Sequence, residues 1–515
     1  MSLDLSVPRD LFIALLPELV LTTWGLILLL VVAARHRTER DRRLAGWLTL
    51  AALASTAVVA WWLWWRSAVP AGIPAMIAVD DFRFMTDCLF LGTAALTVLA
   101  SFDYLEREQL RAPEYYVLLL FATLGMMLMS GGEDLMVIFL GLEVMSVSAY
   151  VLAGINRRDP GSAEAALKYF LLGAFATAFL LYGIALTYGA TGATNLTLIG
   201  AQIQAQTLVH NNMLLLGLGL LLIGFGFKVA AVPFHMWAPD VYDGAPTPVA
   251  GYMAAGVKAA AFAALFRVLA EGFAGIAAWQ HIVWGLAAAT MIAANFIALA
   301  QRTVKRMLAY SSVAHAGYLL VAVSAGARAG GGGAAAGAFM FYLAAYSLTT
   351  IAAFALLAAI GRNGERDVRI DDLAGLASRR PALAAALAVC MLSLLGFPGT
   401  AGFIGKWYIL LAATAAGQGG LALLLVLTSV VSAGYYLPVV MAMYMKSEPS
   451  AEAHTAVRLG RLSGAVVTAA VAGLLVFGIQ PSRLLELARS SGASVRAPNA
   501  APTTPPAAVS AGGGR

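Results

Sequence analysis

The stretch GFGFKVAAVPFHMWAPDVYDGAPTPVAGYMAAGVKAAAF, residues 224–262, decides the fold of this chain. It places Lys228 and Lys258 in apolar sequence, and Pro233 interrupts the first of its two apolar runs. An ionised side chain within a bilayer costs roughly 2.5 to 3.5 kcal/mol on insertion scales. A helix broken at that depth is tolerated only where protein or water satisfies the freed backbone groups. The stretch therefore indicates a membrane protein whose interior holds charge.

The composition supports this interpretation. Apolar residues make up 61% of the 515 residues and charged residues 12%, against roughly 45 to 50% and about 25% in soluble domains. A membrane-crossing helix needs about 20 residues, and fourteen apolar runs qualify. The expected fold is an all-α polytopic membrane protein, with helices near 11–34, 44–65, 84–102, 115–130, 135–155, 164–190, 213–236, 249–270, 280–300, 306–326, 336–360, 382–414, 420–445 and 462–480.

The distribution of basic residues tests this division. Twenty Lys and Arg residues fall at the odd-numbered connections between runs, and three fall at the even-numbered ones. Because basic residues gather in cytoplasmic loops, the pattern predicts fourteen spans with both termini on the non-cytoplasmic side. The net charge of +6 is then explained without nucleic acid. The first run exceeds the roughly 7 to 15 residues of a secretory signal, so we expect it to be retained.

Cofactor motifs are not visible in the sequence. Cys88 and Cys390 stand alone, without the Cys or His spacing that binds zinc or an iron–sulfur cluster. The glycines of 330–333 join two apolar runs and do not follow a strand pattern. We therefore expect no cofactor and no metal in this chain. Residues 491–515 are mostly Ala, Pro, Ser and Gly, and we expect a disordered tail.

Titratable side chains within or beside the predicted spans are the candidate site residues: Glu143, Lys168, Lys228, His235, Lys258, His315 and Lys406. Structural roles compete with a functional one. Glu143 could pair with a lysine to hold two helices together, and Lys168 follows Glu164 by four residues, the favourable order for a helical ion pair. Arg267 lies near a span end, where a side chain that reaches the membrane surface would explain it.

Lys228 is the strongest candidate because it lies beside the break at Pro233. A lysine that loses water holds its proton less tightly, and a nearby carboxylate reverses the effect. Lys258 lies too deep in its run for an easy reach to the interface. His235 and His315 can pass protons near neutral pH, although a lone buried histidine is more often a satisfied hydrogen-bonding group.

Lys406 belongs to a second interrupted run. Residues 382–414 are too many for one straight span, and Gly396, Pro398 and Gly399 lie in the middle of the run. The interrupted runs are the seventh and the twelfth, so spans 4 to 8 and 9 to 13 are expected to form two oppositely inserted five-helix units around an ion path.

The expected divisions of the chain are 1–113 (three helices), 114–271 and 272–447 (the two units), 448–490 (helix 14) and 491–515 (the tail).

The stretch 224–262, together with FLGLEVMSVSAYVLAG (139–154), RMLAYSSVAHAGYLL (306–320) and GFPGTAGFIGKWYIL (396–410), resembles the antiporter-like membrane subunits of respiratory complex I, NADH–quinone oxidoreductase. The opening LLPELVLTTWGLILLL (15–30) resembles the N-type subunits of that family. The resemblance implies proton translocation driven by NADH-to-quinone electron transfer. It places flavin, iron–sulfur clusters and quinone in partner subunits.

The resemblance also implies roles for single residues. Glu143 would be the carboxylate paired with Lys228, and Lys258 would be the central lysine. His235 would bridge these lysines, and Lys406 would lie on the exit side. Lys168 would match a further lysine of the sixth helix.

The implied partners are other membrane-arm subunits, including neighbouring antiporter-like subunits, and the lipid bilayer, with no nucleic acid. The implied location is the bacterial inner membrane. Two other functions stay open. One is a subunit of a multi-subunit cation/proton antiporter with the same fold, and the other is a membrane scaffold whose charges are only structural.

Overall fold

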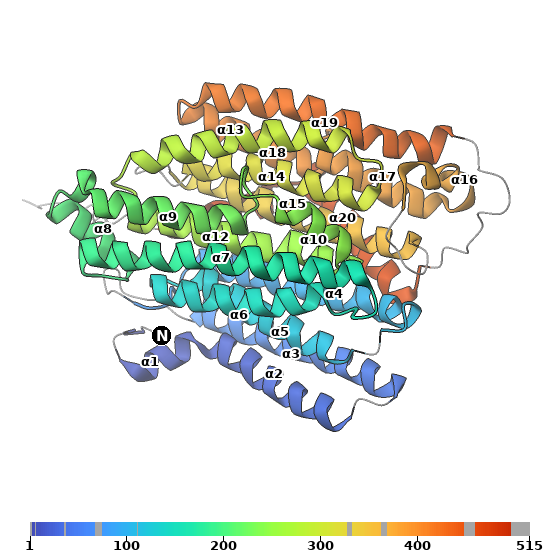
Figure 1. Cartoon of the computed structure of the whole chain (residues 1–515), viewed down its shortest axis with the longest axis horizontal. Coiled ribbons are helices and arrows are strands. Elements are labelled where there is room, and N and C mark those ends of the chain that lie inside the picture. Colours follow the sequence, from blue (N-terminus) through green and yellow to red (C-terminus); the bar gives the residue numbers. More distant parts are fainter. Residues whose placement is uncertain are drawn as a thin grey trace, which may run out of the picture.

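The computed structural model describes residues 3–5, 7–35, 38–66, 75–110, 112–326, 332–361, 368–446 and 459–495. Within these ranges the chain is helical, and extended pairing is limited to isolated bridges (Figure 1). The first half contains α1 (Pro8–Ala14), α2 (Leu16–Ala34), α3 (Glu39–Arg66), α4 (Asp81–Arg107), α5 (Glu114–Gly131), α6 (Leu135–Ala153), α7 (Pro160–Thr191), α8 (Leu196–Ala205), the 3₁₀ turn η1 (Leu208–His210), α9 (Asn212–Lys228), α10 (Trp237–Gly244), α11 (Thr247–Tyr252), the π-helix η2 (Met253–Val257), α12 (Lys258–Arg267) and the π-helix η3 (Val268–Gly272).

The second half continues with long helices and one more interruption. Its elements are α13 (Ala278–Leu299), α14 (Val304–Gly326), α15 (Gly332–Ile360), the 3₁₀ turn η4 (Ile370–Leu373), α16 (Leu376–Arg379), α17 (Pro381–Leu395), α18 (Ala401–Ala415), α19 (Gly419–Met445), α20 (Arg461–Ile479) and α21 (Ser482–Ser494).

The all-helical membrane fold predicted from the sequence is confirmed. In the described ranges, 12 helices are long and apolar enough to cross a membrane, and each coincides with one of the predicted runs. The other two runs, 213–236 and 382–414, contain the shorter helices α9, α17 and α18. The total of fourteen crossings, the inverted units and the side of the termini stay predictions.

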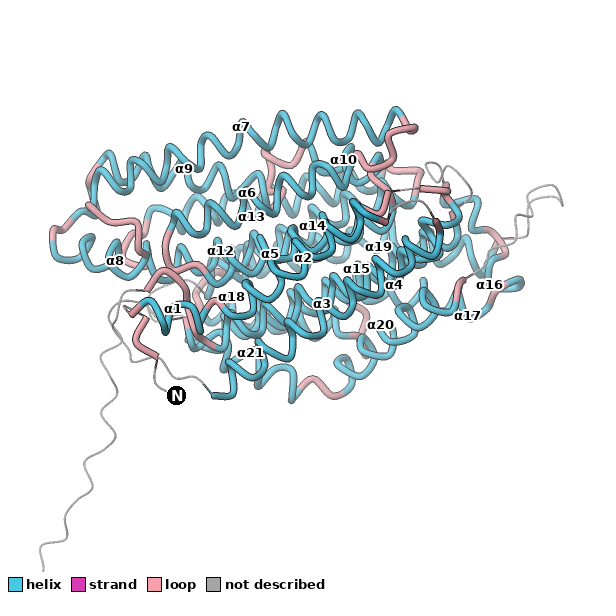
Figure 2. Tube along the Cα trace, turned by 90° about the horizontal axis from the view of Figure 1, so that it is seen from below, coloured by secondary structure: helices cyan, strands magenta, loops and turns pink. Residues whose placement is uncertain are grey.

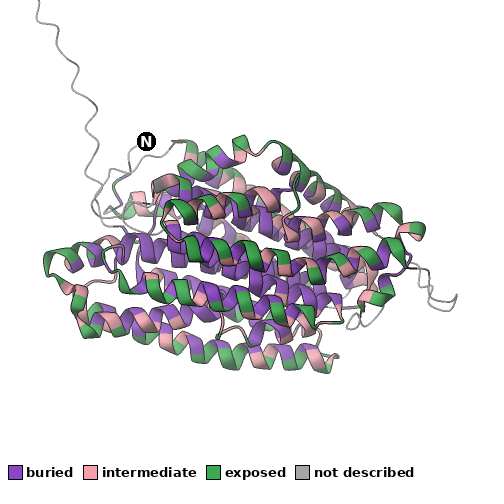
Figure 3. Cartoon of the chain, turned by 90° about the horizontal axis from the view of Figure 1, so that it is seen from above, coloured by how far each residue is buried: buried purple, intermediate pink, exposed green. Residues whose placement is uncertain are grey.

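The long helices lie side by side in an elongated bundle with buried and outer layers (Figures 2 and 3). The run from α11 to η3 is buried along its whole central stretch, and α14 nearly so. The outer helices α2, α7, α19 and α20 bury about a third of theirs. Lys258 and His315 therefore lie in the layer that contacts lipid least.

The outer surface of the bundle is apolar. Leu30, Phe175, Val430 and Ile479 are each exposed by about two thirds or more. Exposing apolar surface to water costs about 25 cal/mol per Å², and a continuous apolar belt of this kind is unfavourable for a soluble chain. Lipid removes that cost, so the surface is that of a multi-pass membrane protein.

The first predicted break is present. Helix α9 ends at Lys228. If the helix continued, the ring of Pro233 would clash with the carbonyl of Val229, four residues earlier. Ala230 adopts a positive φ of 58°. The freed backbone finds partners, because the Trp237 indole donates to the Phe227 carbonyl at 2.9 Å and the Val232 N–H to Thr290 Oγ1 at 2.9 Å.

The second predicted break is present too. Gly396 ends α17 with a φ of 88° and Gly399 has a φ of 87°, values that a side chain makes costly. Thr400 then caps α18 by accepting from the Phe403 N–H. Both interruptions thus arise from local residue chemistry, which explains why sequence alone predicted them.

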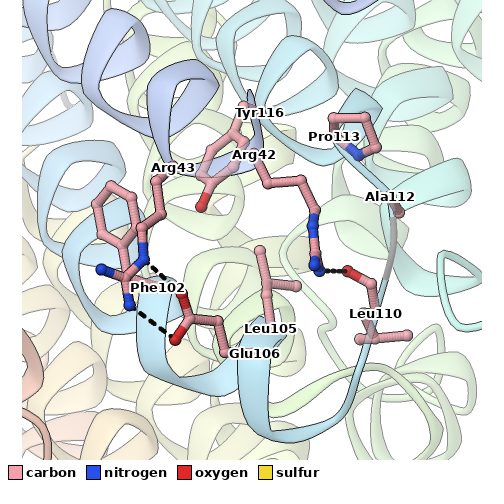
Figure 4. Close-up of a pocket in the computed structure, with 9 residues that line it drawn as sticks. All are labelled: Arg42, Arg43, Phe102, Leu105, Glu106, Leu110, Ala112, Pro113 and Tyr116. Carbon is pink, nitrogen blue, oxygen red and sulfur yellow. Dashed lines mark hydrogen bonds and ion pairs between the residues drawn. The ribbon is translucent and has the colours of Figure 1, made fainter. Parts of the chain in front are cut away.

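Polar contacts tie the helix ends together at the end of the bundle where α3 begins and α4 finishes. Arg43 donates to both Glu106 oxygens at 2.6 and 3.0 Å, and Arg42 donates to the Leu110 carbonyl at 3.4 Å (Figure 4). The pocket between them has a volume of about 20 Å³, enough for about one water molecule. It is too small for a substrate.

Helix α21 follows the last predicted span. It packs along α15, where Gly333 and Gly337 leave room for Arg489 and Ala493. It runs to Ser494, so residues 491 to 494, which the sequence assigned to the tail, are helical here. Gly492 packs against Ala336 and Gly337 of α15. Residues 496–515 of the predicted tail, and part of the 330–333 glycine run, lie outside the described residues.

Helices α5 and α6 approach closely through two glycines. A Cβ on Gly125 would lie 2.4 Å from the Met145 nitrogen, and one on Gly141 would lie 2.7 Å from the Met129 nitrogen. Small residues permit this kind of backbone contact in membranes. The pair sets the position of α6, which carries Glu143.

We expect Gly125→Ala to destabilise the fold by about 1 to 3 kcal/mol, because the added methyl group meets backbone that cannot yield. The measurement is the unfolding temperature in detergent. The matched control is Gly285→Ala in α13, where a Cβ meets nothing within 4 Å. Equal unfolding temperatures for the two variants would contradict this account of the contact.

Candidate functional site

Lys228, the last residue of α9, is buried against α6. Its Nζ donates to Ser146 Oγ at 2.7 Å and to Tyr150 Oη at 3.1 Å. The rings of Tyr150 and Tyr169 lie 5.2 and 5.8 Å from the same nitrogen. Ring faces attract a cation, the more so when water is excluded. The ammonium group is therefore held by hydroxyls and aromatic faces at the helix break.

Glu143 lies on the same face of α6 as Ser146 and Tyr150, which follow at i+3 and i+7. Its charge acts on Lys228, but in the described structure no ion pair within 4.0 Å joins the two. One carboxylate oxygen, Oε1, is buried without a hydrogen-bond partner. The hydroxyls of Ser146 and Tyr150 bind the ammonium group instead. Glu143 and Lys228, which the resemblance pairs, are therefore neighbours without a direct contact.

Lys258 begins α12 directly after the π-helix η2. Its Nζ donates to the Ser312 carbonyl at 2.8 Å and makes a short hydrogen bond to Ser312 Oγ. Tyr346 Oη donates to the same Oγ at 2.8 Å. Single π turns occur often at functional sites because they shift side chains out of the regular register. This one leads into a lysine whose charge has no carboxylate partner among the described residues.

His315, one turn after Ser312 on α14, is enclosed by tyrosines. Its Nδ1 lies 2.5 Å from Tyr342 Oη and its Nε2 lies 3.1 Å from Tyr436 Oη. The imidazole stacks on Tyr346 with ring centroids 5.1 Å apart. Both ring nitrogens thus have hydroxyl partners. This arrangement suits a histidine that passes protons and equally one with a structural role.

Lys406 lies at the second helix break. Its Nζ donates to the carbonyls of Leu394 and Leu395 at 2.9 and 3.0 Å and to Ser429 Oγ at 2.9 Å. These carbonyls belong to the last turn of α17, which lacks intrahelical partners and carries partial negative charge. The Tyr318 ring lies 4.6 Å from the nitrogen. The cation therefore caps the broken helix.

Aromatic residues link the Lys228 and Lys258 surroundings. The Tyr169 ring stacks on Trp237 at 4.5 Å, and Trp237 meets Tyr242 edge to face at 5.8 Å. Tyr242 in turn lies 5.9 Å from the Lys258 nitrogen. On the other side, the Tyr318 ring that faces Lys406 lies 5.4 Å from the His315 ring. Lys228, Lys258, His315 and Lys406 thus occupy one continuous buried row.

His235 lies in the first break, half-buried, and its Nδ1 has no hydrogen-bond partner. No hydrogen bond joins it to Lys228 or Lys258 in the described ranges. The contacts that link the surroundings of the two lysines are made instead by Tyr169, Trp237 and Tyr242.

Lys168 is separate from this row. Its side chain is 41% exposed and pairs with Glu164 at 2.7 Å, as the i, i+4 spacing predicts, and with Asp240 at 2.8 Å. Arg306 reaches the same Asp240 carboxylate at 2.9 Å. Partial burial opposes the ionisation of Asp240, but the hydrogen bonds of Lys168 and Arg306 outweigh it and lower its pKa.

Arg267 requires a correction. The sequence predicted a side chain that reaches the membrane surface, whereas the guanidinium is fully buried. It donates to Asp80 at 2.8 and 3.0 Å, to Glu271 at 2.8 Å and to the Ser130 carbonyl at 3.0 Å. Asp80 comes from a distant segment and Glu271 from the next helical turn. The hydropathy of the span does not predict these partners.

The hydroxyl partners are the residues that sequence reasoning missed. A signal for some of them exists, because Ser146 and Tyr150 share a helix face with Glu143, and Ser312 shares one with His315. The tyrosines of α15 and α19 carry no such signal, since they come from helices without a charge of their own at that depth.

Comparison with known proteins decides the family. The family described as NADH:quinone oxidoreductase/Mrp antiporter, TM, matches residues 132–432, which include both breaks and all four residues of the buried row. The chain belongs to this family.

Relatives and solved structures agree with this assignment. The chain is 44% identical to the NADH-quinone oxidoreductase subunit N of Trichlorobacter lovleyi, over 93% of this chain and 96% of that one. It resembles a chain of respiratory complex I from Thermus thermophilus with a TM-score of 0.77 and 38% identity, over 92% of this chain and 99% of that chain. A chain of the Mrp complex from Dietzia sp. shares the fold, with a TM-score of 0.81 and 22% identity over 94% and 97%.

We expect Lys168→Gln to lower the free energy of unfolding at neutral pH by no more than about 1 kcal/mol, because the pair is exposed. Asp240 has a lowered pKa, so its contribution is present above the ordinary aspartate value of 3.8 and is lost as pH falls through the folded-state pKa. The difference from the parent chain should therefore shrink in acid. Thermal unfolding across pH measures it, with exposed Arg157→Gln as the control. A difference that grew in acid would contradict the assignment.

Proposed function

We propose that this chain is a proton-translocating membrane-arm subunit of an NADH–quinone oxidoreductase. The observation that carries the proposal is the continuous buried row of Lys228, Lys258, His315 and Lys406, each bonded to hydroxyl or carbonyl groups. Lys228 and Lys406 lie at the two helix breaks. The relatives named subunit N, at 44% identity over nearly the whole chain, support the same conclusion.

The row suits proton transfer chemically. A lysine donates a proton and, once neutral, accepts one. Serine and tyrosine hydroxyls can donate and accept at the same time. Hydroxyls lie between the charged groups at Ser146, Ser312 and Tyr342. A proton can therefore pass along the row through small rotations of side chains and intervening water.

The driving event is a change near Glu143. While this carboxylate is ionised and close, it favours the charged form of Lys228. Electron transfer in partner subunits would move or neutralise the carboxylate, and the proton of Lys228 would then pass towards Lys258 and on to Lys406. One charge crossing 100 mV takes about 2.3 kcal/mol, and a hundredfold change in proton affinity supplies about 2.7 kcal/mol.

Among the described residues no group of three His, Cys, Asp or Glu side chains could hold a metal ion. The proposal places flavin, iron–sulfur clusters and quinone in partner subunits, as the resemblance implies. It also places the chain in a bacterial inner membrane beside other antiporter-like subunits, with both termini on the non-cytoplasmic side.

A cation/proton antiporter subunit is the second candidate, favoured by the fold shared with the Mrp complex chain. The two differ in what co-purifies. Iron and flavin in the isolated complex support the oxidoreductase, and their absence together with Na⁺/H⁺ exchange supports the antiporter.

We expect Lys228→Ala to abolish or sharply reduce quinone-linked proton pumping, because it removes the group whose charge couples Glu143 to the row. The measurement is proton uptake by membrane vesicles during NADH oxidation. Lys446→Ala is the control, since Lys446 is exposed and pairs at the surface with Asp371. Normal pumping by an assembled Lys228→Ala complex would overturn the proposal.

We expect Ser146→Ala to slow pumping while Ser148→Ala does not. Ser146 accepts from the Lys228 ammonium group, whereas Ser148 donates to the Val144 carbonyl on the same helix. Both changes remove one hydroxyl from α6, so helix stability is affected similarly. The ratio of protons pumped to NADH oxidised distinguishes them, and equal ratios would argue against a relay role for Ser146.

A further inference from the structure

A second cluster of buried charges lies outside the lysine row. It joins the N-terminal helices to the end of the α11–η3 run and contains two guanidinium groups and five carboxyl groups: Arg83, Arg267, Glu18, Asp80, Asp87, Glu133 and Glu271. We call it the carboxyl cluster. In the described ranges, no three of its carboxyl groups are arranged to hold a metal ion.

Two arginines organise the cluster. Arg83 donates to both oxygens of Glu18 at 2.6 and 2.7 Å, and its Nε lies 3.7 Å from Asp87. Arg267 binds Asp80 and Glu271. Asp80 connects the two halves, because it also accepts from the backbone N–H of Arg83 at 2.8 Å as the cap of α4.

The charges of the cluster do not balance. Five ionised carboxylates against two guanidinium groups would leave three uncompensated negative charges among side chains that are mostly buried. An unpaired ionised carboxylate in such surroundings costs several kcal/mol, and like charges at short range cannot all stay ionised. Electrostatics therefore favours bound protons within the cluster.

The contacts of individual carboxyl groups agree with this. Asp87 is fully buried and neither of its carboxyl oxygens has a hydrogen-bond partner. Glu271 Oε2 is buried and unpartnered too. A buried carboxyl oxygen that receives no hydrogen bond makes the ionised form of its group costly, so these three oxygens favour a protonated cluster.

The cluster opens to the surface at one edge. Glu133, in the turn between α5 and α6, is partly exposed, and Asp80 is 15% exposed. Burial raises the pKa of Glu133 to about 7, against the opposing charges of Arg267 and Arg83. The carboxyl group at the edge therefore changes protonation near neutral pH.

The location connects the cluster to the lysine row. Lys258 begins α12, Arg267 ends it, and Glu271 lies in η3 directly after it, so one buried helix of about 20 Å carries both groups. Asp80, Glu133 and Glu271 lie in three of the predicted even-numbered connections, which the distribution of basic residues assigns to the non-cytoplasmic side.

We propose that the carboxyl cluster binds a proton that leaves the lysine row at Lys258, as a branch from the path to Lys406, and releases it to water on the non-cytoplasmic side. This inference rests on the proposed function. In the step, an O–H bond forms on a carboxylate as the proton arrives, and the same bond breaks as the proton passes to water at Glu133. No electron or other group is transferred.

Infrared spectroscopy of the purified complex in lipid nanodiscs tests the proton directly, because a protonated carboxyl group has a C=O stretch that a carboxylate lacks. The parent complex should show this band, part of which titrates near pH 7. Glu133→Gln should remove the titrating part, and Asp87→Asn should remove intensity from the remainder. Glu486→Gln, an exposed acid on α21, is the control and should leave the band unchanged.

Pumping by the same complexes separates this inference from the proposed function. Lys228→Ala should lose pumping and keep the band, whereas Asp87→Asn should lower pumping and reduce the band in a complex that still assembles. An unchanged band and normal pumping in both assembled Asp87→Asn and Glu133→Gln complexes would overturn the inference while leaving the lysine row intact. Normal pumping by Lys228→Ala would instead overturn the proposed function, whatever the band shows.

Discussion

The structure depends on the need of buried ammonium groups for partners in a medium that cannot supply water. Each lysine of the row meets that need differently. Lys228 uses hydroxyls and ring faces of α6 and α7, Lys258 uses Ser312, and Lys406 uses the unpaired carbonyls of a broken helix. In low-dielectric surroundings such contacts are strong, and their loss is costly. The packing around the row follows from this requirement.

The helix breaks serve the same requirement. An unbroken helix pairs its own carbonyls and has none to offer, whereas α17 ends at Gly396 and leaves two carbonyls for Lys406. At the first break the freed Phe227 carbonyl binds Trp237, and that indole also belongs to the aromatic link between Lys228 and Lys258. Backbone irregularity that would be unfavourable in lipid is thus satisfied within protein.

Much of this could be predicted because the signals are local. Apolar runs, the proline and glycine breaks and the isolated charges are visible one segment at a time, and the charged row follows from them. The partners could not be predicted in the same way. Tyr342 and Tyr436 reach His315 from helices that carry no charge at that depth, and Arg267 finds Asp80 across 187 residues. The sequence around an arginine that reaches the membrane surface does not differ from that around a buried one, so the positions of the neighbouring helices are needed to distinguish them.

The sequence by itself determined the helices, the two interruptions and the depth of the lysines, because helix length, apolar content and the chemistry of Pro and Gly act over a few residues. Only the tertiary structure decided what each charge contacts. It put hydroxyls between Glu143 and Lys228, set Lys168 in a surface network, and gathered five carboxyl groups around two buried arginines. Such contacts depend on which helix faces meet, and that is settled by packing over the whole bundle.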